Sequence, residues 1–219
     1  TEVGKIIYEN DPYNEELGTL ALLHYFLATS KESATSWYFF FNVFRNVEFT
    51  KDDFITQLKN YIRANGEESS DRALEDDYSC ILNTYIPKAK LSAGKENPEN
   101  NIDCPLGELS LVEVLNRKEK IYKKAMISLE KLDSLIALAI ILRENPEKKE
   151  IKISSLLTEE KNLGKLFNLD MESLVKILYN LERLEYIKVV RTAGLDVIRV
   201  EKDIDYLTAI KEYYNSINN

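Results

Sequence analysis

Basic side chains gather near the C-terminal end of the chain, on and just before a predicted hairpin. Residues 186–192 (YIKVVRT) and 195–200 (LDVIRV) are two β-rich runs around a short turn that contains Gly194, which is the pattern of a β-hairpin. Lysine and arginine neutralise DNA phosphates, so this pattern predicts a DNA contact led by the hairpin. The candidate DNA-binding residues are Lys176, Arg183, Lys188, Arg191 and Arg199.

The helical stretch before the hairpin carries charge of both signs. Its three carboxylates, Glu172, Glu182 and Glu185, would oppose a phosphate backbone. Two interpretations therefore stay open. The segment either contacts DNA or serves as a packing and protein-docking module.

Other chemically active residues are few. His24 is the sole histidine, so it is the one imidazole with which Cys104 could form a thiol–imidazole pair. Nothing near Cys104 in the sequence favours a lowered thiol pKa. A lone His in an apolar helix indicates a hydrogen-bonded core group, and Cys80 is expected on a buried helix face. The acidic run Glu75–Asp77 is interpreted as a solvated helix start rather than a magnesium site. We expect no enzymatic activity, no metal and no cofactor.

The elements that must position these residues are mainly helices. Buried helices are predicted at Leu17–Ala28 and Ala34–Arg45, and amphipathic helices at about 51–64 and 70–86. The apolar face expected for the last of these consists of Leu74, Tyr78, Ile81, Leu82 and Tyr85. Thr50 and Asp53 form a weak capping box before the third of these helices. Residues 88–103 are predicted to form a loop or linker, because they combine Gly, Pro and charge with almost no apolar side chains.

The last third changes character. An apolar helix at 132–142 precedes a short β-like piece at 151–153, and one or two short helical pieces follow to Phe167. Asp170 then caps a further helix, in which Leu174, Ile177, Leu178 and Leu181 are expected to face inward. With the hairpin, this is the order of a winged helix. The predicted fold is mainly α: a helical domain, residues 1–131, followed by a C-terminal winged-helix-like domain, residues 132–219, with a small β-hairpin and a closing helix.

The overall charge limits the function. With 29 basic and 37 acidic residues the formal net charge is −8, so a nucleic-acid contact must use a local patch. One basic stretch, residues 117–131, is predicted to be helical and to be either a solvated face or a phosphate track.

No apolar run reaches the ~20 residues that a bilayer requires. We expect a cytoplasmic protein without a membrane partner and of undetermined oligomeric state.

Several strings together resemble a known bacterial family. They are DPY at 11–13, GTLALLHYFLA at 18–28, ATSWY at 34–38 and DCPLGEL at 103–109. In this order they are similar to the domain of unknown function 4007 family. The resembling motif positions are Asp11, Pro12, Tyr13, His24, Tyr25, Trp37, Tyr38, Asn42, Asp103, Cys104 and Pro105; most are expected to be structural.

The resemblance implies a biological setting but no catalytic activity. Genes of this family tend to neighbour phosphoadenosine-phosphosulfate-reductase-like genes and genes of DNA phosphorothioation or phage defence. The expected function is therefore a non-enzymatic, DNA-associated accessory or regulatory protein of such a system. The alternative is a protein–protein interaction subunit that docks a partner of the same system through its acidic helical face. Family resemblance also implies a further N-terminal segment, resembling a helix-turn-helix, upstream of Asp11.

Overall fold

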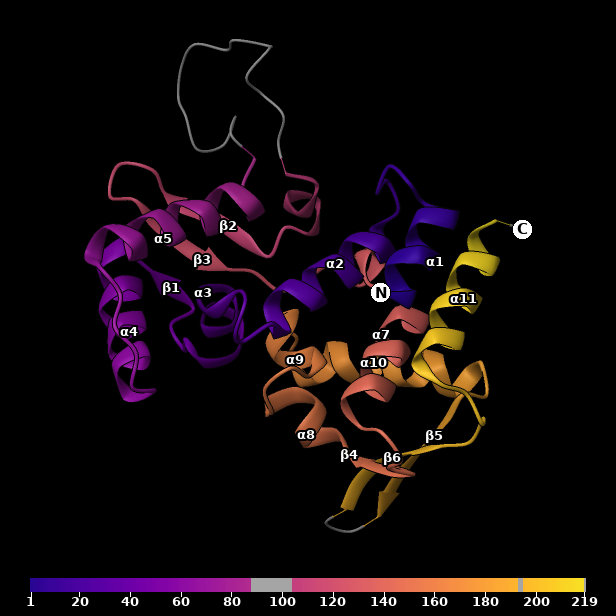
Figure 1. Cartoon of the computed structure of the whole chain (residues 1–219). Helices are drawn as coiled ribbons and strands as arrows, with labels where there is room; N and C mark the ends of the chain where they lie inside the picture. Colours follow the sequence, from indigo (N-terminus) through magenta and orange to yellow (C-terminus); the bar gives the residue numbers. More distant parts are fainter. Residues whose placement is uncertain (88–103, 193–194, 219) are drawn as a thin grey trace. The chain divides into compact units, whose positions relative to one another are not determined.

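The computed structural model describes residues 1–87, 104–192 and 195–218 (Figure 1). Two compact units make up the chain. The C-terminal unit combines Thr1–Tyr25 with Ile127–Asn219, and the central unit is Phe26–Met126. The first 25 residues thus group with the last third of the chain, whereas the sequence placed them with the N-terminal domain. The predicted linker at 88–103 lies outside the described residues.

The central unit is built on aromatic side chains. Helix α3 (Thr35–Tyr38) continues directly into a π-helical turn, η1 (Phe39–Val43), and strand β1 (Glu48–Phe49) follows. Phe40 packs edge-to-face on Phe49 and Phe54, with ring centroids 5.3 and 5.8 Å apart. Such ring pairs add to the free energy of burying apolar area. The predicted burial of the segment Ala34–Arg45 is confirmed for Tyr38 and Phe39–Phe41.

Two amphipathic helices complete the helical part of this unit. Helix α4 (Lys51–Ala64) begins with the predicted capping box, in which Asp53 N donates to Thr50 Oγ1 at 3.3 Å and Thr50 N donates to Asp53 Oδ2 at 2.9 Å. Helix α5 (Asp71–Tyr85) buries the predicted face that contains Leu74 and Tyr85. Cys80 is exposed on α5, so its predicted burial is wrong: it follows the buried Tyr78 by two positions and points to the opposite side of the helix.

The basic stretch 117–131 is not a helix. A 3₁₀ turn, η3 (Pro105–Leu109), leads into strand β2 (Val112–Asn116), which pairs antiparallel with β3 (Ile121–Lys124). A second 3₁₀ turn, η4, spans Leu129–Lys131. The helix prediction is wrong because it rested on the intrinsic helix preference of lysine and glutamate. In the structure, pairing and packing against β2 outweigh that preference and make the segment a strand. The sheet order is β1–β3–β2.

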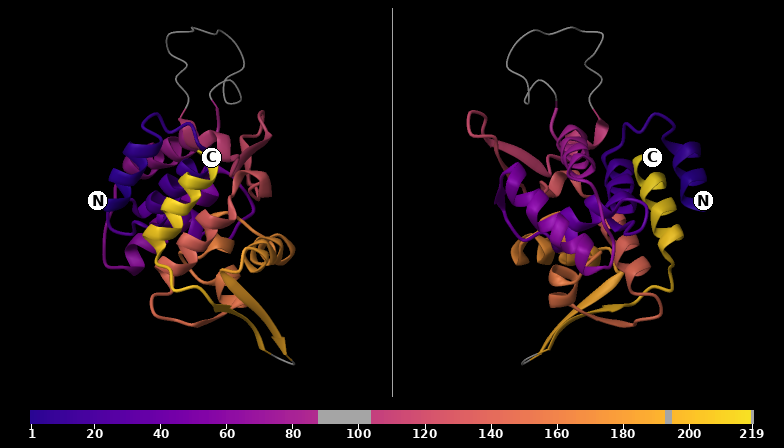
Figure 2. Two further views of the ribbon diagram at one scale, coloured as in Figure 1. Left: turned by 90° about the vertical axis from the view of Figure 1, so that its right-hand side faces the viewer. Right: turned by 60° about the vertical axis from the view of Figure 1, so that its left-hand side comes forward.

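In the C-terminal unit, a second sheet lies at one end of a group of helices (Figure 2). Helices α1 (Glu2–Asn10) and α2 (Leu17–Thr29) begin the chain, and α2 runs on into the central unit. Helix α7 (Ser134–Glu144) packs against the closing helix α11 (Tyr206–Ile217). Tyr213 Oη of α11 accepts a hydrogen bond from Gly18 N at 3.1 Å, where any Cβ would lie within 2.3 Å of the Tyr213 ring.

The rest of this unit follows the predicted order of elements. Strand β4 (Glu150–Lys152) precedes α8 (Ile153–Thr158) and α9 (Leu163–Leu166), then α10 (Met171–Arg183). Strands β5 (Ile187–Thr192) and β6 (Leu195–Val200) form the predicted hairpin. The sheet order is β4–β6–β5 and all pairs are antiparallel. The fold is therefore largely helical with two three-stranded antiparallel sheets.

Among the described residues, no helix has the length and apolar content needed to cross a membrane.

Candidate nucleic-acid interface

The hairpin places two candidate basic residues side by side. Lys188 of β5 is the direct register partner of Arg199 of β6, and Arg199 is in turn opposite Glu150 of β4. Directly paired residues project to the same face of a sheet. These three residues therefore form one row across the sheet, which we name the Lys188 row. All three are exposed.

The opposite face of the sheet is buried and fixes this arrangement. The neighbouring row consists of Ile151, Ile198 and Val189. Ile198 is fully buried and Ile151 is 3% exposed. Because side chains alternate along a strand, burial of this row turns the Lys188 row toward solvent.

Arg199 already has an anionic partner. Its Nη2 and Nε donate to Glu150 Oε1 at 2.6 and 3.1 Å. The hydrogen bond and charge of Glu150 raise the pKa of Arg199 above its ordinary value. Both side chains are about half exposed, and an ion pair in that environment is weak enough for a phosphate to compete with it.

Arg191 lies at the far end of the hairpin and contacts helix α10. Its register partner is Asp196, and its guanidinium carbon lies 5.8 Å from the ring centroid of Tyr179. That distance is within the range of a cation–π interaction. The contact links the exposed end of the hairpin to the exposed face of α10.

Helix α10 is held by its cap and its apolar face. Ser173 N donates to the Asp170 carboxylate at 2.7 Å, as the predicted N-cap requires. The buried side chains are Ser173, Leu174, Ile177, Leu178 and Leu181, and they include the four that the sequence placed inward. The opposite face is exposed.

Two candidate basic residues lie on this exposed face. Lys176 Nζ is 2.7 Å from Glu172 Oε1 one turn earlier, and that carboxylate raises the pKa of Lys176. Arg183 is exposed in the last turn and lines a hollow that also includes Asp133 and Glu212. In the structure, Lys188 therefore lies beside Arg199, and Arg191 contacts α10. Lys176 and Arg183 each lie near carboxylates.

The first family motif positions build the N-terminal part of the C-terminal unit. Asp11 is buried and accepts hydrogen bonds from Glu15 N at 2.9 Å and Glu16 N at 3.0 Å. Burial acts to raise the pKa of Asp11, but hydrogen bonds led by that from Glu15 outweigh it and lower the pKa below its ordinary value. Pro12 and Tyr13 are exposed, Tyr13 by 81%.

His24 and Tyr25 follow on α2. His24 is fully buried, its Nε2 lies 2.8 Å from Leu166 O, and its ring meets Phe167 edge-on. Burial lowers the pKa of His24 to about 4, against a smaller opposing effect of the Leu166 carbonyl. The expected hydrogen-bonded core histidine is confirmed. Tyr25 Oη donates to Glu144, and burial raises the pKa of Tyr25 far above its ordinary value.

Later motif positions lie in the central unit. Asn42 is buried, and its Nδ2 donates to Ala28 O at 2.9 Å and Tyr38 O at 3.0 Å. Trp37 is partly buried in α3, and its Nε1 has no hydrogen-bond partner among the described atoms. Cys104 is partly exposed and, with Pro105, starts η3. Asp103 lies outside the described residues. Among the motif positions, the hydrogen bonds of Asp11, His24, Tyr25 and Asn42 are of a structural kind.

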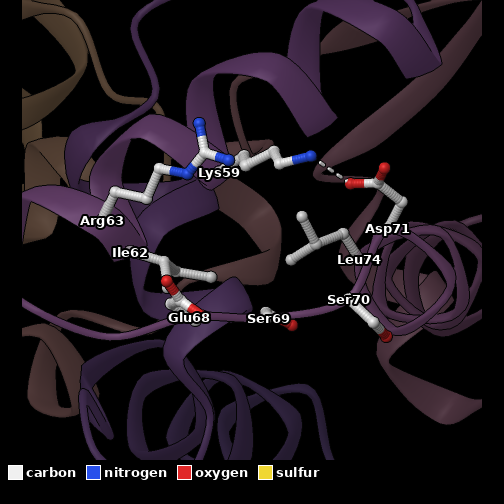
Figure 3. A pocket seen from close by; sticks show the side chains of 8 residues that line it. All are labelled: Lys59, Ile62, Arg63, Glu68, Ser69, Ser70, Asp71 and Leu74. Carbon is white, nitrogen blue, oxygen red and sulfur yellow. Dashed lines mark hydrogen bonds and ion pairs between the residues drawn. The ribbon is translucent and has the colours of Figure 1, made fainter.

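The acidic start of α5 is engaged with basic side chains of α4. Glu75 Oε2 lies 2.6 Å from Lys51 Nζ, and Asp71 pairs with Lys59. Figure 3 shows the hollow beside this second pair, lined among others by Arg63 and Glu68. Within residues 1–87, 104–192 and 195–218, no group of three or more His, Cys, Asp or Glu side chains is arranged to hold a metal ion.

The family assignment is settled by a match along the chain. A family model described as "Protein of unknown function (DUF4007)" matches residues 1–214. The chain belongs to the DUF4007 family. A comparison with curated proteins finds no match.

Two solved structures share the DUF4007 fold seen here. They are described as "SspB crystal structure" and "Magnesium ion-bound SspB crystal structure". Each aligns with a TM-score of 0.80 at 22% sequence identity, and covers 96% of this chain and 64% of the other. This DUF4007 chain therefore spans less than two thirds of the length of those proteins. At this identity the similarity shows a shared fold.

Sequence reasoning missed three residues of this DUF4007 surface. Lys152 of β4 is exposed two positions beyond Glu150, on the same face of the sheet as the Lys188 row. Glu150 pairs with Arg199, and Tyr179 contacts Arg191. The predicted β-like piece at 151–153 was the available signal for the first two. Pairing that piece with the hairpin would have placed Lys152 and Glu150 beside the candidate basic residues.

Proposed function

We propose that this DUF4007 chain is a non-enzymatic, DNA-associated accessory or regulatory protein whose C-terminal unit is a winged helix that contacts the phosphates of duplex DNA. The observation that carries the proposal is the sheet order β4–β6–β5 beside α10. The elements α7, β4, α8 with α9, α10, β5 and β6 follow the winged-helix order. In helix-turn-helix modules the corresponding helix enters the major groove.

The charges of the sheet support phosphate contact. The Lys188 row is net positive, and Lys152 adds a cation on the same face of the sheet, two positions beyond Glu150. Arg191 is exposed at the end of the same hairpin, on the opposite face of the sheet, so it is not part of this cluster. A local cluster of this kind can bind DNA even in a chain of net charge −8, because phosphate contacts act over less than a Debye length at physiological salt.

The family resemblance adds the DNA modification to the proposal. We place the protein in a DNA phosphorothioation or phage-defence system, with the proteins of that system as further partners. The two interpretations of the DNA contact, general binding and sensing of sulfur, differ in one measurable respect. A sensor binds a phosphorothioated duplex more tightly than the plain duplex of the same sequence.

The test is a fluorescence-anisotropy titration with both duplexes at low and physiological salt. We expect salt-sensitive binding that weakens in the double variant Arg191→Ala/Arg199→Ala, with a shallower salt dependence because two phosphate contacts are lost. A matched control is Arg117→Ala/Lys118→Ala, which removes two exposed charges from the turn between β2 and β3. Unchanged affinity in the hairpin variant removes the hairpin from the mechanism.

A second function is favoured by the exposed carboxylates of the central unit. Glu67, Glu68 and Asp76 are exposed around the start of α5 and would suit a basic protein partner. In this alternative the chain is an interaction subunit of the same system. No anisotropy change on DNA, together with stable association with the purified product of a neighbouring gene, would support it over DNA binding.

A further inference from the structure

One exposed aromatic side chain lies on the solvent-facing side of α10. Tyr179 is 46% exposed on α10, on the face opposite the buried Ile177 and Leu178. Helical spacing places Lys176 three positions before it and Arg183 four positions after it, on the same face. An apolar ring therefore lies between two cations along the helix.

A third cation reaches this ring from the hairpin. The Arg191 guanidinium carbon lies 5.8 Å from the Tyr179 ring centroid, and Arg191 is itself exposed. Lys176 is paired with Glu172 toward the start of the helix, so it does not cover the ring. The arrangement combines cations suited to phosphates with an accessible apolar surface suited to a base.

We infer that Tyr179 contacts the C5-methyl groups of thymines in the major groove of the bound duplex. The inference rests on the proposed function, in which α10 enters that groove. In an intact duplex the base faces are covered by stacking, so a helix in the groove meets base edges. The thymine methyl is the apolar group on those edges. The phosphate contacts of Arg183 and Arg191 would position the ring without reading sequence.

The experiment isolates the methyl group. Binding of the full chain is measured on a short alternating adenine–thymine duplex and on the same duplex with uracil in place of every thymine. Uracil differs from thymine only by the absent methyl. We expect wild type to bind the thymine duplex about fourfold more tightly, the equivalent of one buried methyl group. Tyr179→Ala should bind the two duplexes equally.

Three controls separate this effect from others. Tyr179→Phe keeps the apolar ring and should keep the preference for thymine. Arg191→Ala should weaken binding to both duplexes by the same factor. Tyr8→Ala removes another exposed tyrosine, 74% exposed on α1, and should change neither affinity. Circular dichroism spectra establish that each variant is folded.

The outcomes distinguish this inference from the proposed function. Salt-sensitive binding of wild type without a thymine preference overturns the inference and leaves the DNA contact intact. A thymine preference that persists in Tyr179→Ala also overturns it, since the preference then arises from another residue or from duplex shape. Absence of binding to either duplex overturns the proposed function and this inference with it.

Discussion

The two sheets of the protein carry similar basic residues in rows of opposite net charge. In the central unit, Lys123 of the middle strand β3 lies between Glu48 and Glu113. In the C-terminal unit, Arg199 of the middle strand β6 lies between Glu150 and Lys188. One row is net negative and the other net positive. We therefore expect the register partner of each cation, more than the number of cations in the segment, to decide whether a strand attracts phosphate.

The residue next to Lys123 sharpens this contrast. Lys124 turns toward its own unit, where its Nζ donates to Phe40 O and, at 2.5 Å, to Phe44 O. The same ammonium lies 4.8 Å from the Phe40 ring centroid. It satisfies carbonyl groups at the end of the π-helical turn η1, which have no partner further along the helix. The most engaged lysine of the basic stretch is therefore a structural residue.

The largest effect that tests this contrast is expected for Lys124→Met, which keeps the aliphatic stem and removes the charge. We expect the free energy of unfolding to fall by about 2–3 kcal/mol, because two partly buried carbonyl groups lose a charged donor. Urea unfolding measures the change. DNA affinity should stay at the wild-type value.

The matched control is Lys118→Met, in the exposed turn between β2 and β3. Its free energy of unfolding should change by less than about 0.5 kcal/mol. If Lys124→Met costs no more than this control, Lys124 is a surface residue and the contrast between the two sheets is wrong.

The second test concerns the pH dependence of the free energy of unfolding. The sole histidine, His24, belongs to the C-terminal unit. The folded pKa of His24 is lowered to about 4 from an ordinary 6.5. Between these values the unfolded chain binds a proton that the folded chain does not, so stability falls as the pH falls through this window. We expect a loss of about 2 kcal/mol in the free energy of unfolding between pH 7.5 and pH 5.

The variant His24→Gln tests the assignment of this pH dependence. A glutamine amide can donate to the Leu166 carbonyl but does not titrate. The variant should be less stable than wild type at neutral pH and should lose less stability on acidification to pH 5. An equal pH dependence in both proteins would assign the effect to other groups.

Much of the scaffold could be predicted because its signals are local. The Thr50–Asp53 cap and the inward face of α10 each lie within one helix, and a β-rich run on either side of a glycine marks the β5–β6 hairpin. Signals of this kind depend on neighbours within a few residues. The prediction failed where tertiary pairing overrides local preference, as in the basic stretch that forms β3.

The candidate site could be predicted only in part, for the same reason. Lys188, Arg191 and Arg199 are visible as basic residues of one hairpin. The partner of Arg199 is Glu150, 49 residues earlier, and no local pattern shows that β4 joins the sheet beside β6. Similarly, Tyr179 gains its significance from Arg191, which packs on it from another element. The grouping of residues 1–25 with the C-terminal unit also depends on contacts distant in sequence, such as that between Gly18 and Tyr213.

The smallest expected effect tests the Lys188 row itself. Glu150→Gln removes the charge that competes with phosphate for Arg199, so DNA affinity should rise by about two- to fourfold at low salt. The mirrored variant Glu113→Gln relieves a negative row in the central unit and should leave affinity unchanged. Anisotropy titrations of both variants measure the difference. An equal rise in both would mean that only the net charge of the whole chain matters. A rise confined to Glu150→Gln would mean that cross-strand register determines where DNA binds.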